Sequence, residues 1–315
     1  MEHFVTLFNI LFLPQGLALH LSMERHVVNY TLWILCMDGA VHEILKKMKL
    51  PNVRLLQLSL LETEALKKVK PKRTAVEYCW TTTPFTPRFV FDSDSTVDRV
   101  TYLDADLWFQ KSPSPIFQEF ENSGKDVLIT DHAYSPEYDI TEKSGQYCVQ
   151  FTTFNRVGGE MVRKWWEERC IEWCYAKFEN GKFGDQKYLD DWPDRFPEKV
   201  HVLSNKAWTL APWNASRFPY SGGIFWHFHE LRITEKHSKP MVQFVTSYSI
   251  PPITRKQIYG PYMNDLRAAI ESMKDYGVQP RPQQKYRRFG LLKGLLKGIR
   301  HQLWRVNHEL VSNLY

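Results

Sequence analysis

The chain has 315 residues, of which 43% are hydrophobic and 24% are charged, as is ordinary for a soluble globular protein. Its net charge of +6 is local, because residues 281–308 carry eight Lys or Arg and no acidic residue, which leaves 33 basic residues against 35 acidic ones elsewhere. A nearly neutral body argues against a general nucleic-acid-binding protein and favours one basic segment with its own partner.

The five cysteines form no CxxC pair and have no histidines at zinc-finger spacing, so we expect free thiols in a reducing compartment. The apolar stretch over residues 7–21 is broken by polar residues and lacks the basic start and cleavage site of a signal peptide. No uninterrupted apolar run of 18 residues occurs. We therefore expect a cytoplasmic protein without a membrane-spanning helix.

Short apolar runs alternate with helical segments along the first 250 residues. This alternation predicts an α/β fold with a mostly parallel central sheet and flanking helices, in one compact domain over residues 1–250. We expect helices at 41–49, from 113, at 159–175 and in parts of 74–91. The expected strands lie at 4–8, 30–36, 53–58, 100–103, 126–130, 149–154, 200–203 and 223–229.

Residues 251–315 are expected to form a C-terminal appendage. Within it, apolar residues recur at spacings of three and four over about 284–310, with Lys and Arg beside them, which predicts a basic amphipathic helix. Such a helix fits an anionic membrane surface, and it equally fits docking on the body of the protein or on a second subunit. A membrane partner implies a peripheral position on the inner face of the cell membrane.

An acidic pair, Asp104 and Asp106, follows the apolar run at 100–103. In extended backbone this i, i+2 spacing places both side chains on the same side, at the end of a buried strand where ligands of parallel sheets bind. Two carboxylates so placed repel each other unless a cation lies between them, and their hard oxygens suit Mg²⁺ or Mn²⁺. The alternative is a solvated acidic turn without a ligand.

Two further stretches carry groups that are suited to chemistry. His227 and His229 alternate in a strand pattern, so either imidazole is a candidate metal ligand, or both are structural residues. Asp185 and Gln186 open a helical stretch, where Asp185 is either a helix N-cap or a polar group facing a substrate. Asp190 and Asp191 are candidates for hydroxyl recognition or for a solvated helix face.

Several common catalytic motifs are absent from the sequence: a GxGxxG after a strand, GxxxxGK[ST], GxSxG and HExxH. Hydride transfer, P-loop phosphoryl transfer and serine hydrolysis thereby lose their usual sequence markers.

Three stretches in the same order, 100–107 (VTYLDADL), 184–189 (GDQKYL) and 227–229 (HFH), resemble the glycogenin and lipopolysaccharide galactosyltransferase family. The resemblance covers roughly residues 4–235. It implies a GT-A fold, that of the Rossmann-like nucleotide-diphospho-sugar transferases, and a metal-dependent retaining glycosyltransferase. It further implies that Asp104, Asp106 and His227 hold Mn²⁺ or Mg²⁺.

The same resemblance implies contacts with the donor. Gln186, near the anomeric carbon, and Asp185 take the catalytic positions, and Phe8 and Asn9 occupy the place after the first strand where the family holds the nucleoside. The residues expected to bind the donor are Phe8, Asn9, Tyr78, Thr83, Asp104, Ala105 and Arg232.

We therefore expect an enzyme of polysaccharide biosynthesis, a hexosyltransferase-like protein that moves a sugar from a nucleotide-diphospho-sugar, expected to be a UDP-sugar, to a glycan or lipid-linked acceptor with retention. One alternative is an inactive sugar-binding or scaffold protein on the same fold. The other is a nucleotidyltransferase, which would need a basic, glycine-rich loop after the first strand, whereas residues 9–16 contain no Lys or Arg.

Overall fold

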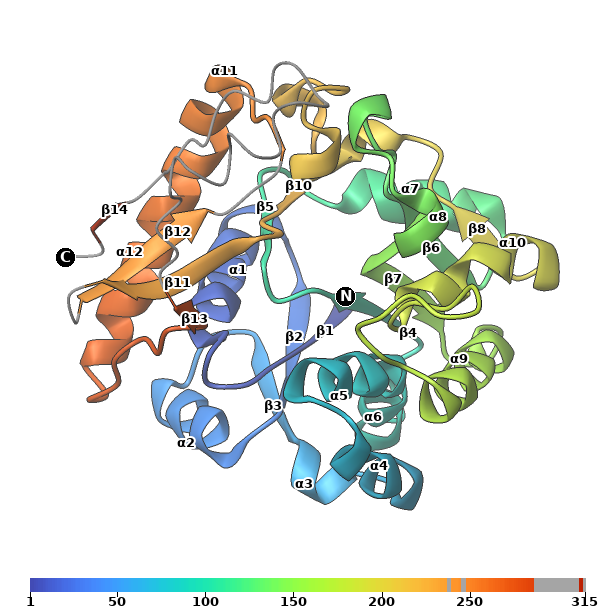
Figure 1. Ribbon diagram of the computed structural model, residues 1–315. Coiled ribbons are helices and arrows are strands. Elements are labelled where there is room, and N and C mark those ends of the chain that lie inside the picture. Colours follow the sequence, from blue (N-terminus) through green and yellow to red (C-terminus); the bar gives the residue numbers. More distant parts are fainter. Residues whose placement is uncertain (237–238, 245–247, 286–311, 314–315) are drawn as a thin grey trace.

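A computed structural model describes residues 1–236, 239–244, 248–285 and 312–313 (Figure 1). Its centre is a seven-stranded sheet with the order β3-β2-β1-β4-β7-β6-β8. Only β7 in this sheet runs antiparallel to its neighbours, β4 and β6, so the predicted mostly parallel α/β fold is confirmed. The strands are β1 (Glu2–Phe8), β2 (Tyr30–Cys36), β3 (Val53–Gln57), β4 (Arg99–Leu103), β6 (Val127–Asp131), β7 (Tyr147–Asn155) and β8 (Val200–Val202).

Helices cover both faces of this sheet, because apolar side chains of its strands point to both. In β1, Phe4 and Phe8 face α1, α2 and α7, whereas Val5 and Leu7 face α5 and α6. α9 packs over β6 and β7. The longer helices are α1 (Leu13–His26), α2 (Gly39–Met48), α4 (Glu64–Val69), α5 (Ala75–Thr82), α6 (Thr86–Ser93), α7 (Ser114–Ser123), α9 (Glu160–Glu172) and α12 (Gly260–Lys274).

Local sequence explains where several of these helices begin and end. Asp38 caps α2 by accepting a hydrogen bond from the Val41 N–H at 2.8 Å. Thr74 and Glu77 form a capping box at the start of α5. α7 ends at Gly124, whose left-handed backbone (φ 64°) is one that glycine adopts without strain.

A small second sheet, not foreseen in the sequence, lies beyond the end of β4. It has the order β5-β10-β9 and consists of β5 (Leu107–Phe109), β9 (Thr209–Leu210) and β10 (Phe225–His227). Because β5 follows β4 after only three residues, pairing with β5 brings β10 from far along the chain to the acidic pair. The predicted strand at 223–229 is therefore shorter than expected.

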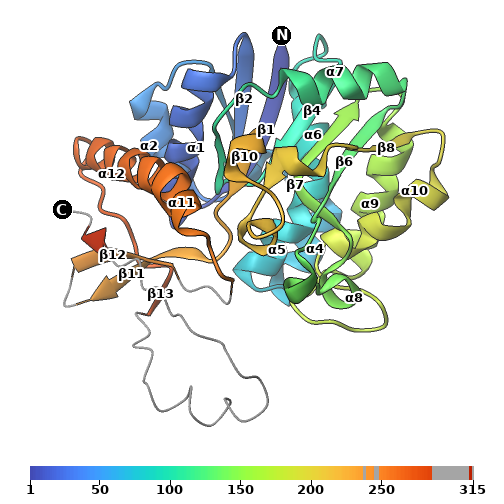
Figure 2. The same cartoon turned by 90° about the horizontal axis from the view of Figure 1, so that it is seen from above.

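The segment after residue 250 packs on the body through α12, which lies beside α1 (Figure 2). The Tyr262 ring of α12 stacks on Phe228 with centroids 3.5 Å apart. The boundary expected at residue 250 stays a prediction. A third sheet has the order β13-β11-β12-β14 and consists of β11 (Leu231–Lys236), β12 (Lys239–Phe244), β13 (Gln284–Lys285) and β14 (Ser312–Asn313).

The amphipathic helix predicted for about 284–310 lies outside the described residues, apart from the two that form β13. Among the helices that the structure describes, none has the length and apolar character that a bilayer crossing requires. All five cysteines are free thiols, as predicted.

Candidate metal and donor site

The acidic pair lies at the carboxyl end of β4, where the chain turns from the large sheet to the small one. The Asp104 N–H donates to the Gln150 carbonyl of β7 at 3.1 Å, and the Leu107 N–H closes the turn on the Asp104 carbonyl at 3.2 Å. The Asp106 carbonyl accepts from the Phe228 N–H at 2.9 Å, which ties the turn to the end of β10. Backbone hydrogen bonds therefore fix both aspartates from two sides.

His227 reaches the same place because β10 pairs with β5, and this pairing sets His227 opposite Leu107. Its Nε2 lies 3.1 Å from Asp106 Oδ1 and 3.7 Å from Asp104 Oδ2. One ligand atom from each of the three side chains lies within 4.8 Å of the other two. Two carboxylates and one imidazole at these separations form a donor set that fits a divalent cation.

The charges of the three side chains are strongly coupled. Burial raises the pKa of Asp104, and the Asp106 charge raises it further, although His227 opposes both effects. Burial acts in the same direction on Asp106, but His227 and Arg232 hold the pKa of that carboxyl well below its usual range. The two carboxylates raise the pKa of His227 well above its usual range despite burial, so a positive charge is stabilised at this point.

His229 lies beside His227 but is in a different electrostatic environment. Burial and the neighbouring His227 lower the pKa of His229 to about 3, so its ring is neutral. The Trp213 ring makes edge contacts with both imidazoles, with centroids 5.3 Å from His227 and 5.5 Å from His229. Of the two histidines, His227 is the one that belongs to the cluster with the aspartates.

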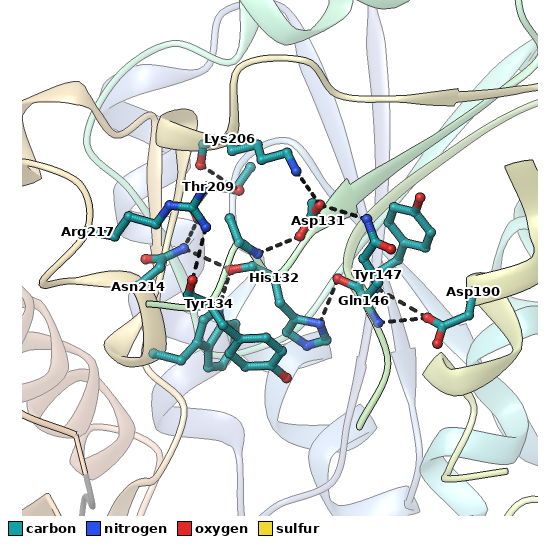
Figure 3. Close-up of polar contacts among 12 residues, drawn as sticks. Asp131, His132, Tyr134, Gln146, Tyr147, Asp190, Lys206, Thr209, Asn214 and Arg217 are labelled. Carbon is teal, nitrogen blue, oxygen red and sulfur yellow. Dashed lines mark hydrogen bonds and ion pairs between the residues drawn. The ribbon is translucent and has the colours of Figure 1, made fainter. Parts of the chain in front are cut away.

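An aromatic wall, formed by His132, Tyr134 and Trp213, stands next to the cluster. His132 stacks on Tyr134 with centroids 4.7 Å apart, and Trp213 packs edge-on to His132 at 5.2 Å. The Trp213 Nε1–H donates to the His132 carbonyl at 2.8 Å. Figure 3 shows the polar contacts around this wall, in which Asp131 accepts from Lys206 at 2.6 Å and from Gln146 at 3.2 Å.

Asp185, one of the two predicted catalytic residues, lies close enough to the cluster for the charge of Asp104 to act on it. Its side chain is 3% exposed, and its Oδ2 has no hydrogen-bond partner within the described part of the chain. Burial raises the pKa of Asp185 well above its usual range, and the charge of Asp104 raises it further. Asp185 precedes a 3₁₀ helix, η4 (Gln186–Asp191), but its side chain makes no capping hydrogen bond, which removes the N-cap interpretation.

Gln186 follows Asp185 in the chain, and Thr83 contacts the Asp185 carboxyl from another segment. The Gln186 Nε2 donates to the Ser144 carbonyl at 2.8 Å, so this amide is held by the end of the short helix α8 (Thr141–Ser144), which precedes β7. Thr83 donates to the Cys79 carbonyl at 3.1 Å and also interacts with the Asp185 carboxyl. The structure thus brings Thr83 and Asp185 together, and their expected contacts with a donor stay predictions.

Other residues expected to bind the donor are more dispersed. Arg232 donates to the Leu231 carbonyl at 2.8 Å, and its charge acts on Asp106. Asn9 accepts from the Leu11 N–H at 3.0 Å. Phe8 and Ala105 are buried, and Tyr78 is buried behind the sheet, where its hydroxyl bonds Glu62. Their roles stay predictions.

The two acidic residues further along η4 have structural partners. Asp190 accepts from the Gln146 N–H at 2.8 Å and from Lys187 Nζ at 2.8 Å, which anchors the start of β7. Asp191 accepts from Arg195 one helical turn later. For Asp190, these contacts favour a structural role over hydroxyl recognition.

Comparison with other proteins gives the family of the chain. It is 32% identical to the uncharacterized protein YfnF of Bacillus subtilis (strain 168) over 257 residues, which cover 76% of this chain and 84% of YfnF. It is 29% identical to the uncharacterized protein YfnD of the same strain over 273 residues, or 80% of this chain and 85% of YfnD. The chain belongs to the family of YfnF. No protein-family model matches it.

Among solved structures, the bifunctional glycosyltransferase WbbM superposes with a TM-score of 0.51 at 14% identity, over 89% of this chain and 52% of WbbM. Mouse xyloside xylosyltransferase 1 (TM-score 0.47, 16% identity) covers 72% of this chain and 96% of its own. The galactosyltransferase LgtC (TM-score 0.48, 12% identity) covers 72% and 86%. The superposition on WbbM and the mostly parallel central sheet show the GT-A glycosyltransferase fold, as predicted. The specific family predicted from the three motifs is not established by these likenesses.

Three residues that contact the cluster were not predicted from the sequence as site residues: Tyr102, Gln150 and Trp213. Tyr102 had a usable signal, because it precedes Asp104 by two residues and so shares its side of the strand. Gln150 and Trp213 come from segments that no local pattern connects to the acidic pair.

Proposed function

We propose that this protein is a metal-dependent glycosyltransferase that transfers a sugar, expected to be a hexose, from a nucleotide-diphospho-sugar to a glycan or lipid-linked acceptor. The observation that carries the proposal is the cluster of Asp104, Asp106 and His227 at the carboxyl edge of a sheet with the GT-A fold. A UDP-sugar as the donor, Mn²⁺ as the metal and retention of configuration are the finer parts of the proposal.

The metal has a definite place in this scheme. Asp104, Asp106 and His227 would hold it, and when bound it would neutralise the diphosphate and stabilise the departing nucleoside diphosphate. Arg232, whose charge already acts on Asp106, supplies a further positive group toward the same phosphates. Phe8 and Asn9 at the end of β1 hold the nucleoside in this proposal, and Tyr78, Thr83 and Ala105 line the donor site.

The proposed reacting side of the donor faces Asp185 and Gln186. Asp185 has a buried oxygen without a partner among the described residues, and a donor hydroxyl would satisfy it. Burial and the charge of Asp104 raise the pKa of Asp185, so a positive charge that develops nearby would favour its ionised form. Gln186 orients the sugar through its amide, and attack from the side on which the nucleotide leaves would retain the configuration.

The acceptor and the location of the protein are proposed from the sequence. The basic segment that begins near residue 281 would hold a cytoplasmic enzyme at an anionic membrane surface, close to a lipid-linked acceptor, with a second subunit as the alternative partner. Removing residues 286–315 and measuring sedimentation with vesicles of phosphatidylglycerol and phosphatidylcholine tests this part. Unchanged sedimentation would contradict it.

Two other functions are compatible with the same fold. An inactive sugar-binding protein would bind nucleotide-sugars without consuming them. A nucleotidyltransferase would release pyrophosphate from a nucleoside triphosphate, and the loop after β1, which has no basic residue at 9–16, argues against it.

The test is hydrolysis of a panel of nucleotide-sugars with and without Mn²⁺. We expect release of nucleoside diphosphate from at least one member, only with the metal, and a loss of at least about 100-fold in Asp104→Asn. Asp92→Asn, at an exposed aspartate that pairs with Arg88, is the matched control and should keep full activity. Full activity of Asp104→Asn would exclude metal catalysis by the cluster.

A further inference from the structure

Gln150 of β7 makes a hydrogen bond to Asp104 and another to His227, two of the three proposed metal ligands. Its backbone carbonyl accepts from the Asp104 N–H at 3.1 Å, and its side-chain Oε1 lies 2.8 Å from His227 Nδ1. The side chain is fully buried. We propose that Gln150 is the positioning residue of the metal centre, which fixes the orientation and the tautomer of His227 so that Nε2 is available to a divalent cation. This inference rests on the proposed metal-dependent function.

The chemistry of the hydrogen bond carries the first step. An amide oxygen only accepts, so the His227 Nδ1 that faces it carries a proton. Without a metal, Nε2 carries a proton as well and faces Asp106 Oδ1 at 3.1 Å. When a cation displaces that proton, Nδ1 keeps its own proton on Gln150, and the lone pair of Nε2 points to the cluster. Gln150 therefore selects the tautomer that can bind a metal.

The other end of the same amide supports this assignment. Within the described residues, Gln150 Nε2 is buried and has no hydrogen-bond partner. The contact with His227 is thus the one hydrogen bond of this buried side chain among the described residues, and it is what fixes the orientation of the amide.

The backbone of β7 is irregular at the same place. Leu128 of β6 pairs with Thr153, but Thr130 pairs with Cys148, so β7 has four residues between these pairs where β6 has one. The Thr152 hydroxyl satisfies the Val149 carbonyl at 3.1 Å within this bulge. Such irregularities re-aim side chains next to functional sites. Here the bulge covers residues 149–152 of β7 and therefore includes Gln150.

The neutrality of Gln150 also matters for charge. Once a divalent cation has displaced the Nε2 proton of His227, the ring is neutral and the two aspartates give the ligand set a charge of −2, which matches the cation. A carboxylate at position 150 would keep the acceptor and add a negative charge, whereas an apolar side chain would remove the acceptor and leave the ring free to rotate or to change tautomer.

The experiment measures Mn²⁺ binding by the full chain without any nucleotide. Free Mn²⁺ is counted by electron paramagnetic resonance, and electron spin-echo modulation from a coordinated ¹⁴N reports whether an imidazole is bound to the metal. Gln150→Met removes the acceptor, and Gln150→Asn withdraws it by one methylene while keeping an amide. Gln150→Glu retains it. Thr153→Val is the control, because Thr153 lies in β7 as Gln150 does, and the change removes a buried hydrogen bond to Thr101 of β4.

We expect Gln150→Met and Gln150→Asn to bind Mn²⁺ about 10- to 100-fold more weakly and to lose the ¹⁴N modulation. Gln150→Glu should bind at least as tightly as the wild type with the modulation intact, and Thr153→Val should bind as the wild type does. If Gln150 only contributed to folding, the Mn²⁺ affinities of Gln150→Glu and Gln150→Met would not differ according to whether the side chain can accept a hydrogen bond from His227.

Two results would overturn the inference, and they are distinguishable. If the wild type binds Mn²⁺ but the Met and Asn variants bind it equally well with the same ¹⁴N modulation, the assignment of Gln150 is wrong and the metal site stands. If the wild type binds no Mn²⁺, the metal site of the proposed function falls, and the role of Gln150 falls with it.

Discussion

The Tyr102 hydroxyl donates a 2.8 Å hydrogen bond to Asp104 Oδ1, two residues further along the chain. Tyr102 is buried at the end of β4, so its ring is fixed by the sheet, and the bond leaves Asp104 Oδ2 as the oxygen nearer to His227. The carboxylate is thereby presented to the cluster by one defined oxygen. Tyr102, which belongs to the same stretch of sequence as the acidic pair, thereby completes the geometry of Asp104.

Replacing Tyr102 by Phe removes only this hydroxyl. Asp104 then loses a hydrogen bond to its charged form, and we expect Mn²⁺ affinity to fall about tenfold, as is typical of residues that orient metal ligands. Mn²⁺ titration followed by electron paramagnetic resonance measures the change. Tyr30→Phe, at another buried tyrosine whose hydroxyl bonds Glu24, is the matched control and should leave Mn²⁺ affinity unaltered. Equal affinities in wild type and Tyr102→Phe would show that the hydroxyl is dispensable.

The aromatic wall offers a prediction about stability. Asn214 is fully buried and donates to the carbonyls of His132 at 3.1 Å and Thr209 at 3.0 Å, while it accepts from the Ala211 N–H at 2.9 Å. Asn214→Ala should lower the free energy of unfolding by about 3 kcal/mol, because buried backbone groups lose their partners. Trp213→Phe should cost less, about 1–2 kcal/mol, since Asn214 still satisfies the His132 carbonyl.

Urea unfolding of the two variants measures this difference. A loss in Trp213→Phe that equals or exceeds the loss in Asn214→Ala would mean that ring packing, and not the hydrogen bonds of Asn214, stabilises the wall.

Much of the fold was predictable because its signals are local. β2 has the bounds expected for it, since an unbroken apolar run from Tyr30 to Cys36 is buried on both faces of a parallel sheet. The grouping of Asp104 with His227 was also expected, but from a resemblance between motifs and not from spacing. Physical reasoning alone left His227 and His229 equivalent, and only the pairing of β10 with β5 separates them.

The rest depended on contacts between distant segments. The direction of β7 and its bulge carry no local pattern, so the position of Gln150 next to His227 was not visible in the sequence. The burial of Asp185 could not be foreseen either, because an Asp before a helical stretch more often caps the helix. Gln150 and Asp185 are both buried polar residues, which a pattern of apolar residues inside and polar residues outside does not predict. Such exceptions are expected near functional sites.

Gly16 of α1 is required by the ring of Phe8. A Cβ at position 16 would lie 2.4 Å from that ring, whereas a Cβ at Gly39 in α2 would meet nothing within 4 Å. Gly16→Ala gains about 1 kcal/mol in helix propensity but overpacks the core by about 1–3 kcal/mol, so we expect a net loss of about 1 kcal/mol in the free energy of unfolding.

Gly39→Ala is the control, and it should be neutral or slightly stabilising. Combining Gly16→Ala with Phe8→Leu should cost less than the sum of the two single changes, because the smaller side chain relieves the overlap. Simple additivity in urea unfolding would contradict a direct contact. Since Phe8 is expected to lie at the nucleoside, the same variants also test whether its position matters for donor affinity.

His3 at the start of β1 makes the stability of the sheet depend on pH. Trp33 Nε1–H donates to its Nδ1 at 3.2 Å, so the ring accepts a hydrogen bond with its lone pair. Burial lowers the pKa of His3 below its usual value of about 6.5, and Arg54 lowers it further, although Asp94 opposes this. Between the pKa of His3 in the folded chain and its usual value, the unfolded chain therefore binds more protons than the folded chain, and stability falls as the pH falls through this window.

The slope from one such group is at most about 1.4 kcal/mol per pH unit. His3→Gln keeps an acceptor for Trp33 but cannot bind the proton, so its free energy of unfolding should change less than that of the wild type between pH 7 and pH 5. Urea unfolding at half-unit intervals gives both curves under the same conditions. Parallel curves would show that His3 titrates alike in the folded and unfolded chains, and that its burial next to Trp33 does not exclude the proton.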